Sequence, residues 1–250
     1  MKESVHLKVD GNDILGELYL PDGEKPFPTL CLCHGIPSGK PPDPSDGGYP
    51  LLAEKFTRAG FATLIFNFRG AGISGGDFDI MGWTRDLQAA IDYLYSHPGV
   101  DKSRLYIMGF SGGAAAANYV AASDTRISRV VLCCCAAGFN KLIMPDKAET
   151  TIANLRKQGV IRSEDFPPSL DEWFEGFRYI VPPRWIDKIS PRPLLIVHGD
   201  EDELIEVGQA WQLYETAGEP KEIAIIKGAA HQLRKNQEAM NITLEWLKRD

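Results

Sequence analysis

A serine flanked by glycines stands out among the residues that could do chemistry, in the pentapeptide Gly109-Phe110-Ser111-Gly112-Gly113. It directly follows the largely apolar run 104–108 and directly precedes four alanines, so we expect a strand before Ser111 and a helix of small residues after it. In that setting the pentapeptide is typical of a nucleophile elbow, in which the serine lies on a strained turn and the glycines let strand and helix approach. Without those flanking elements it would indicate only a loop that ends a strand. The sequence predicts that Ser111 is a nucleophile.

A serine hydroxyl is a poor nucleophile until a base takes its proton, and histidine is the base suited to neutral pH. In mainly parallel sheets, reactive groups collect on loops that follow the carboxyl ends of strands. His231 has this position, because it follows the last predicted strand through Gly228-Ala229-Ala230. We therefore predict that His231 is the base. His6 and His97 are interpreted as structural or surface residues. His34 and His198 also end strands, but each lies at the edge of an apolar run and is followed by a glycine.

The base in turn needs a carboxylate that holds the imidazole in the required tautomer. The loop after the predicted strand 193–198 is rich in acidic side chains, most of which would suit a solvated turn. Its carboxylates are Asp200, Glu201, Asp202, Glu203 and Glu206. Spacing alone leaves Asp200 and Asp202 as alternatives for the orienting acid.

The elements that must position these residues follow from hydrophobic periodicity. Strands are predicted at 5–9, 14–20, 29–33, 61–68, 105–109, 127–137, 193–198 and 222–227. Helices are predicted at 48–60, 84–97, 113–123, 210–217 and 236–248. The first two strands surround a turn and form a hairpin, and the remaining strands alternate with helices. This alternation predicts an α/β fold with a mainly parallel sheet wrapped by helices.

Two stretches interrupt the alternation. One is a proline- and glycine-rich loop at 37–48, and the other is the long segment 139–189. The second contains helix-like pieces at 148–158 and 169–177, and it is far longer than an ordinary connection. We therefore predict a core of residues 1–138 and 190–250 that carries a small helical cap at 139–189. Its aromatic side chains, Trp173 and Trp185 in particular, are predicted to line the cleft for an apolar or aromatic group, or equally to form the cap's own small core.

The composition argues against several classes of partner. With 27 basic and 34 acidic side chains the net charge is −7, and no Lys/Arg-rich run suggests nucleic-acid binding. The N-terminus lacks the apolar stretch of a secretory signal, and no run approaches the length of a membrane span. A cytoplasmic location without membrane contact is the expectation.

The five cysteines are expected to be buried, reduced thiols. All lie in strand-like apolar runs, and their number is odd. The three consecutive cysteines 133–135 would point to alternating faces of a strand, so they cannot converge on one ion. No metal site is predicted from them.

The chain order Ser111, acidic loop, His231 resembles that of the α/β-hydrolase superfamily, and the resemblance covers nearly the whole chain. It implies an eight-stranded type of sheet and, through the match of 198–202 to His-Gly-x-x-Asp, assigns the acid to Asp202. The family often continues with x-x-Val-Pro, whereas here Ile205 keeps only the apolar position. Three further segments resemble family loops: His34-Gly35, the Arg-Gly-x-Gly-x-Ser loop within 67–75, and 228–231.

By the same resemblance, the backbone N–H groups of Ile36 and Gly112 form the oxyanion hole. Ile36 replaces the Gly-Gly of the His-Gly-Gly-Gly loop found in lipases and esterases. The chain is therefore more similar to short-cap hydrolases resembling cinnamoyl esterases and serine aminopeptidase-like proteins. Arg69 is interpreted as a structural brace beside the elbow rather than as a substrate clamp.

These residues together predict a serine hydrolase that cleaves a carboxylic ester of a small molecule through a covalent acyl-enzyme, with no metal or organic cofactor. The same residues would also suit a peptidase or aminopeptidase, a thioesterase, an acyltransferase or a carbon–carbon bond hydrolase. A non-catalytic ligand-binding protein is a further alternative, although no member of the predicted triad is missing. The sequence does not indicate the oligomeric state.

Overall fold

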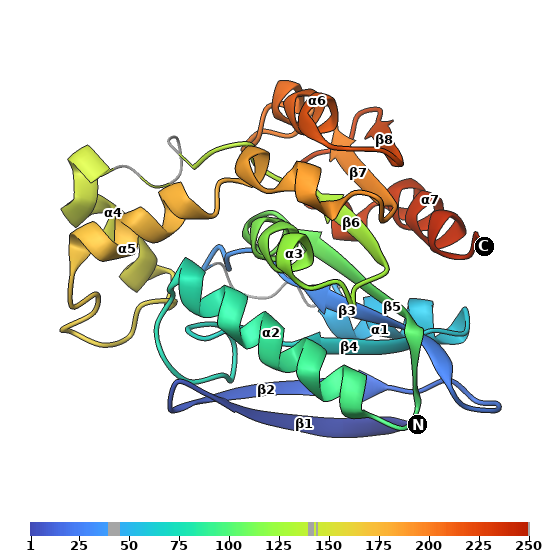
Figure 1. Cartoon of the computed structure of the whole chain (residues 1–250). Helices are drawn as coiled ribbons and strands as arrows, with labels where there is room; N and C mark the ends of the chain where they lie inside the picture. The colour runs from blue at the N-terminus through green and yellow to red at the C-terminus, as the bar shows by residue number, and fades with distance from the viewer. Residues whose placement is uncertain (40–45, 140–142, 144, 250) are drawn as a thin grey trace.

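An eight-stranded sheet runs through the centre of the computed structural model, which describes residues 1–39, 46–139, 143 and 145–249 (Figure 1). The strand order is β1-β2-β4-β3-β5-β6-β7-β8. The first two pairs, β1 with β2 and β2 with β4, are antiparallel, and all later pairs are parallel. The strands are β1 (Lys2–Val9), β2 (Asn12–Tyr19), β3 (Phe27–Cys33), β4 (Ala62–Phe66), β5 (Val100–Phe110), β6 (Arg129–Cys133), β7 (Leu194–Gly199) and β8 (Lys221–Ile226). The predicted hairpin and the mainly parallel α/β sheet are confirmed.

Helices cover both faces of the sheet, as strands that are apolar on both sides require. On β3, Cys31 and Cys33 face one hydrophobic cluster, while Leu30 and Leu32 face the other. The first cluster includes buried side chains of α2, α3 and α6, and the second includes those of α1 and α7. The helices are α1 (Gly48–Arg58), α2 (Ile80–Ser96), α3 (Gly112–Ser123), α4 (Ala148–Lys157), α5 (Leu170–Tyr179), α6 (Val207–Thr216) and α7 (Gln237–Leu247).

Several element boundaries differ from the sequence prediction, and two of the differences have a clear local cause. Helix α2 begins at Ile80 instead of 84, because the Asp79 carboxylate caps the helix by accepting from the Met81 and Gly82 amides at 3.1 and 2.9 Å. Strand β6 ends at Cys133 instead of 137, because the chain turns at Cys134 with φ of 48°. That early turn brings Cys134 to the end of the sheet where the candidate site lies.

Short helices occupy the segment that was predicted to be a cap. Within 139–189 the described residues include α4 and α5 and the 3₁₀ turns at 145–147, 182–184 and 186–189. Both α-helices lie at the left of Figure 1, the end to which the parallel strands run. The division of the chain into core and cap stays a prediction. Of the loop 37–48, positions 40–45 lie outside the described residues.

Among the described residues, every helix is too short or too polar to span a bilayer.

Candidate active site

The turn between β5 and α3 holds Ser111 in a conformation that few residues adopt. Its φ and ψ are 52° and −122°, and its amide donates to the Cys133 carbonyl at 2.9 Å. The neighbouring glycines are needed for close approach: a Cβ on Gly113 would lie 2.2 Å from the His34 carbonyl oxygen, and one on Gly109 would lie 2.5 Å from the Ala114 Cα. The strand, strained serine and helix of the predicted elbow are therefore all present.

Two loops at the same end of the sheet bring His231 and Asp202 together. His231 Nδ1–H donates to the Asp202 carboxylate, at 2.8 Å to Oδ2 and 3.0 Å to Oδ1. The Leu204 and Ile205 amides each donate to Oδ1 at 2.9 Å. Burial raises the pKa of the Asp202 carboxyl, but the hydrogen bonds from His231 and the two amides outweigh it and hold the pKa below its usual value. The carboxylate therefore stays charged and fixes the proton of His231 on Nδ1, leaving Nε2 free to accept one.

The geometry distinguishes the two acids that spacing left open. The Asp200 carboxylate binds the backbone of the histidine loop, since its Oδ1 accepts from the Gly228 amide at 2.6 Å. Glu203 accepts from the His231 amide at 3.0 Å, so it holds the backbone of that residue rather than the ring. Asp202 is the carboxylate placed against His231, in agreement with the resemblance.

A second histidine lies behind Asp202, and sequence reasoning did not find a role for it. His198 is fully buried, with Nε2 2.8 Å from the Ile205 carbonyl oxygen and 3.4 Å from Asp202 Oδ2. Burial lowers its pKa, so the ring is neutral and Nε2–H donates to Ile205. His198 thereby fixes the turn whose amides hold the Asp202 carboxylate. The His-Gly-x-x-Asp motif contained this signal, since it places the histidine at the end of β7.

Ile36 and Gly112 are neighbours across the turn. A Cβ on Gly112 would lie 3.0 Å from Ile36 Cγ1, and one on Gly35 would lie 3.0 Å from Ser111 Cβ. The loop after β3 therefore passes directly over the elbow. The two residues expected to supply oxyanion donors are therefore close neighbours beside Ser111.

His34 fixes the start of that loop. Its Nδ1–H donates to the Gly35 carbonyl at 2.7 Å, and its Nε2 accepts from the Phe68 amide at 3.1 Å. Burial lowers the pKa of His34 to about 4, so the ring is neutral at pH 7 and keeps this tautomer. Its ring also contacts Trp83, with 5.4 Å between centroids. His34 thus ties the loop after β3 to the loop after β4.

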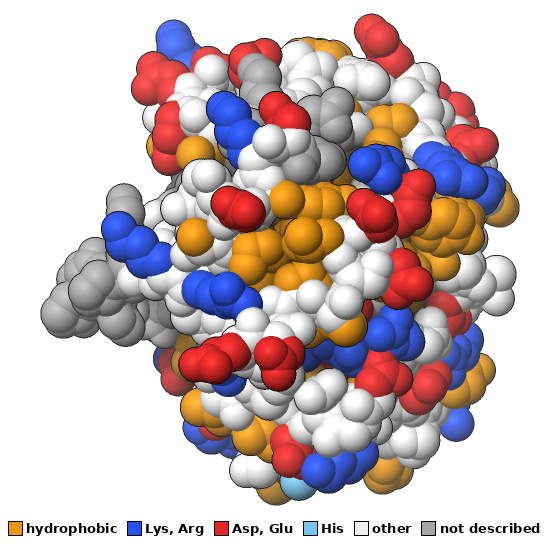
Figure 2. All heavy atoms as spheres, turned by 90° about the vertical axis from the view of Figure 1, so that its left-hand side faces the viewer, with side chains coloured by type: hydrophobic (Ala, Val, Ile, Leu, Met, Phe, Trp, Pro, Cys, Tyr) orange, Lys and Arg blue, Asp and Glu red, His pale blue; other side chains and the backbone are white. Residues whose placement is uncertain are grey.

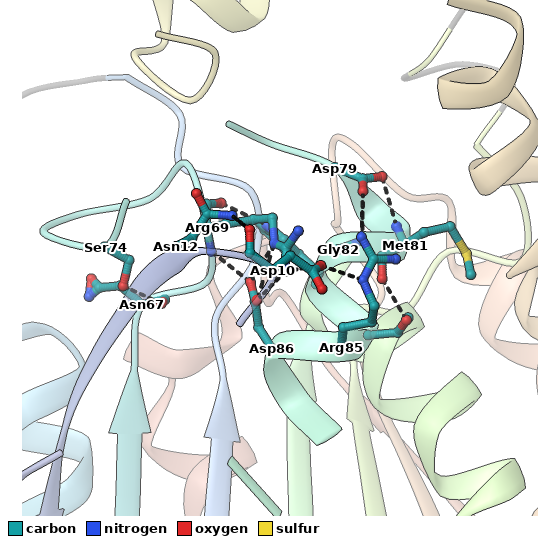
Figure 3. A network of polar contacts seen from close by, with 12 residues as sticks. Asp10, Asn12, Asn67, Arg69, Ser74, Asp79, Met81, Gly82, Arg85 and Asp86 are labelled. Atoms are coloured by element: carbon teal, nitrogen blue, oxygen red, sulfur yellow. Dashed lines mark hydrogen bonds and ion pairs between the residues drawn. The ribbon is translucent and has the colours of Figure 1, made fainter. Parts of the chain in front are cut away.

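A buried network braces the loop after β4, where Arg69 lies between Asp86 and Asp10 (Figure 3). Arg69 Nη2 is 2.7 Å from Asp86 Oδ1 and 2.9 Å from Asp10 Oδ2, and its carbonyl accepts from Trp83 Nε1 at 3.0 Å. The Trp83 ring would in turn lie 3.6 Å from a Cβ on Gly112. Since both carboxylates already occupy its guanidinium, the structural interpretation of Arg69 is confirmed.

Cys134 contacts the site from the end of β6, which sequence reasoning did not anticipate. Its thiol donates to the His231 carbonyl at 3.1 Å, while the preceding residue, Cys133, accepts from the Ser111 amide. Two consecutive residues therefore join the backbones of the elbow and of the histidine loop. All five cysteines are free and buried, as predicted.

The two tryptophans occupy different environments. Trp173 is 4% exposed, and its Nε1 donates to the Phe78 carbonyl at 2.9 Å, so it anchors α5 to the segment before α2. Trp185 is half-buried, donates to the Tyr179 carbonyl at 2.7 Å and packs edge-on against Tyr119 of α3. Both rings therefore pack against residues outside the segment 139–189, and their contact with substrate stays a prediction.

The face that carries α4 and α5 has an apolar centre. Figure 2 shows hydrophobic side chains gathered in the middle of this face, with charged side chains of both signs around them. A patch of this kind at the end of the sheet where Ser111 lies suits contact with an apolar group.

This sheet, with a serine elbow after β5 and a histidine after β8, defines an α/β hydrolase. The chain belongs to the prolyl oligopeptidase family, whose model matches residues 51–250. A curated relative, the uncharacterized protein PA2218 of Pseudomonas aeruginosa, is 25% identical in an alignment 276 positions long that covers 88% of this chain and 72% of PA2218. The chain spans only about half the length of several other curated relatives.

Two solved structures share the fold. The α/β hydrolase GrgF from a Penicillium species has a TM-score of 0.78 at 20% identity, with 100% of this chain and 98% of GrgF covered. Est1E from Butyrivibrio proteoclasticus, in a structure with bound ferulic acid, has a TM-score of 0.70 at 21% identity, with 98% and 96% covered. These similarities support the α/β-hydrolase class that the resemblance implied.

Proposed function

We propose that this hydrolase cleaves carboxylic esters of small molecules through a covalent acyl-enzyme. Ser111 Oγ attacks the ester carbonyl while His231 Nε2 takes its proton and then passes it to the departing alkoxide. Water, activated by the same imidazole, releases the acid and restores Ser111. The observation that carries this proposal is the His231–Asp202 pair, because the buried carboxylate leaves Nε2 as the ring's only available proton acceptor.

The negative charge that develops on the carbonyl oxygen needs donors fixed in advance. We assign this role to the backbone N–H groups of Ile36 and Gly112. Their side-by-side packing over the elbow supports the assignment, as does the rigid attachment of the loop through His34.

An ester suits the surroundings better than a peptide. An aminopeptidase would need carboxylates directed at the substrate amine, and the helical segment was the candidate source. Five acidic side chains of this segment are candidates for that role, and all five are exposed to solvent: Glu164, Asp165, Asp171, Glu172 and Glu175. An alkoxide also leaves more readily than an amine. These points favour an ester over the peptide substrates that the family name suggests.

The favoured acyl or alcohol part of the substrate is apolar or aromatic. The hydrophobic centre of the face in Figure 2 supports this choice, as does the fold shared with Est1E, which binds ferulic acid. The resemblance to cinnamoyl esterases agrees with it. We therefore propose that esters of aromatic acids are cleaved in preference to short acetyl esters.

The test is hydrolysis of a panel of p-nitrophenyl esters by the wild type, Ser111→Ala and the control Ser123→Ala. Ser123 is an exposed serine at the other end of α3, with its hydroxyl bonded within the helix. We expect turnover in the wild type and control and none above background in Ser111→Ala. A thioester and an added alcohol acceptor in the panel identify thioesterase or acyltransferase activity. Binding of an ester without turnover would overturn the proposal in favour of a ligand-binding protein.

A further inference from the structure

The candidate base, His231, is one of three side chains of different chemistry that lie close together. The Cys134 sulfur, an Asp202 carboxylate oxygen and a His231 ring nitrogen all lie within 4.8 Å of one another. They come from the ends of three neighbouring strands, β6, β7 and β8. Of the three consecutive cysteines, only Cys134 belongs to this group, and the strand that was predicted to carry all three ends at Cys133.

We propose that Cys134, Asp202 and His231 form a binding site for a thiophilic divalent cation such as Zn²⁺, and that the bound ion inhibits the enzyme. The binding part is independent of the proposed function. The inhibition part rests on it, because it assumes that His231 acts as the base.

The donor set suits zinc. Thiolate, imidazole and carboxylate are its three usual protein ligands, and three such ligands with one water complete a tetrahedral site. The Asp202 side chain is fully buried and Cys134 is 1% exposed, whereas the His231 side chain is 14% exposed. An ion would therefore enter from the His231 side and be held by the two buried groups behind it.

The ion and the working His231–Asp202 pair exclude each other. Ligand atoms about 2.0 to 2.1 Å from a tetrahedral zinc lie roughly 3.3 Å apart. His231 Nδ1 and Asp202 Oδ2 are 2.8 Å apart with a proton between them. A bound ion must replace that proton and separate the two atoms by about half an ångström.

The proton balance explains the inhibition. Zinc at Nδ1 needs that nitrogen's lone pair, so the ring proton moves to Nε2, while the Cys134 thiol gives its proton to solvent. No electron is transferred. With Nε2 protonated and Nδ1 bound to the ion, the imidazole cannot accept the Ser111 proton, and acylation stops.

The neighbouring cysteine supplies a matched control. Cys135 is as deeply buried as Cys134, but its thiol faces the Ala136 carbonyl at 3.7 Å and lies outside the donor group. Cys134→Ser keeps a hydroxyl that can still donate to the His231 carbonyl, yet a serine is a poor zinc ligand. The pair Cys134→Ser and Cys135→Ala therefore separates a lost ligand from a disturbed core.

The first measurement is titration with Co²⁺, which reports binding without turnover. We expect the near-ultraviolet absorption band of a cobalt–thiolate bond in the wild type and in Cys135→Ala, and no band in Cys134→Ser. Displacement of Co²⁺ by Zn²⁺ then gives the zinc affinity, which Cys134→Ser should weaken by about tenfold or more. A missing band in the wild type, or an equal band in Cys134→Ser, would overturn the proposed site.

The second measurement is ester hydrolysis with increasing Zn²⁺, each variant relative to its own zinc-free rate, with a chelator added at the end. Inhibition in the wild type and Cys135→Ala should be relieved by the chelator, and Cys134→Ser should need about tenfold more zinc. Cobalt binding through Cys134 without loss of hydrolysis would retain the site, contradict the inhibition and place the fault in the role proposed for His231. An enzyme without activity on any ester would contradict the proposed function alone, because the cobalt band does not depend on turnover.

Discussion

Replacing Asp202 by asparagine removes one charge from the site and keeps its shape. The asparagine Oδ1 can still accept from the Leu204 and Ile205 amides, which lie 2.9 Å from Oδ1 of the native carboxylate. Its NH₂ group then faces His231 Nδ1, where the carboxylate oxygen lies at 2.8 Å. Since an amide NH₂ donates, it requires an unprotonated Nδ1 and moves the ring proton to Nε2.

That tautomer cannot take the proton of Ser111. Loss of the orienting carboxylate in a Ser-His-Asp site lowers kcat by about 10⁴, which corresponds to about 5 kcal/mol of transition-state stabilisation. We therefore expect Asp202→Asn to lower kcat by this order with little change in KM, measured by steady-state hydrolysis of the preferred p-nitrophenyl ester.

Asp200→Asn is the matched control, two positions away in the same loop. Its side-chain oxygen can keep the hydrogen bond from the Gly228 amide, and it does not touch the ring, so we expect kcat within a few-fold of the wild type. Equal activity in the two variants, or more than about a tenth of wild-type kcat in Asp202→Asn, would refute the assignment of the acid.

Three further predictions concern stability. Arg69→Met leaves the buried Asp86 carboxylate without its ion-pair partner and should lower the free energy of unfolding, measured in urea, by about 3–5 kcal/mol. The control is Arg85→Met at a half-exposed position, which should lower it by less than about 1 kcal/mol. Equal losses in the two variants would contradict the role of Arg69 as a buried brace. Trp173→Ala should cost about 3–5 kcal/mol, and Trp185→Ala distinctly less, because only the first ring is nearly fully buried. If either variant that folds changes the preference between short and bulky esters, that ring lies against substrate. The Asp202 carboxyl, whose pKa is lowered by folding, stabilises the protein above its unfolded pKa of about 4, so the difference in unfolding free energy between wild type and Asp202→Asn should shrink as pH falls below that value. A difference that stays constant down to pH 2 would contradict the lowered pKa.

The sequence contained the parts of the site that depend on local pattern. The Ser111 elbow was predictable because strand, glycine-flanked serine and small-residue helix are consecutive in the chain. The position of His231 followed from the rule that loops at the carboxyl ends of strands gather at one edge. The choice between Asp200 and Asp202 depends on side-chain direction in a turn, which spacing alone did not decide.

Other features depend on contacts between distant segments and leave no local signal. The burial of Trp173 is set by Phe78, 95 positions away, and composition cannot distinguish such a ring from one that lines a cleft. The early end of β6 arises from the left-handed turn at Cys134, an uncommon conformation for a cysteine, so an apolar run appeared to continue as a strand. The contact of Cys134 with His231 follows from that turn.

The central claim is that Ser111 is an activated nucleophile, and active-site labelling tests it without knowledge of the substrate. Wild type, Ser111→Ala and Asp202→Asn are treated with a fluorophosphonate, and the modified residue is located by mass spectrometry of the digested protein. The account predicts one label per chain on Ser111 in the wild type, none in Ser111→Ala and greatly slowed labelling in Asp202→Asn. A wild type that stays unlabelled, or a label on another residue, would contradict it.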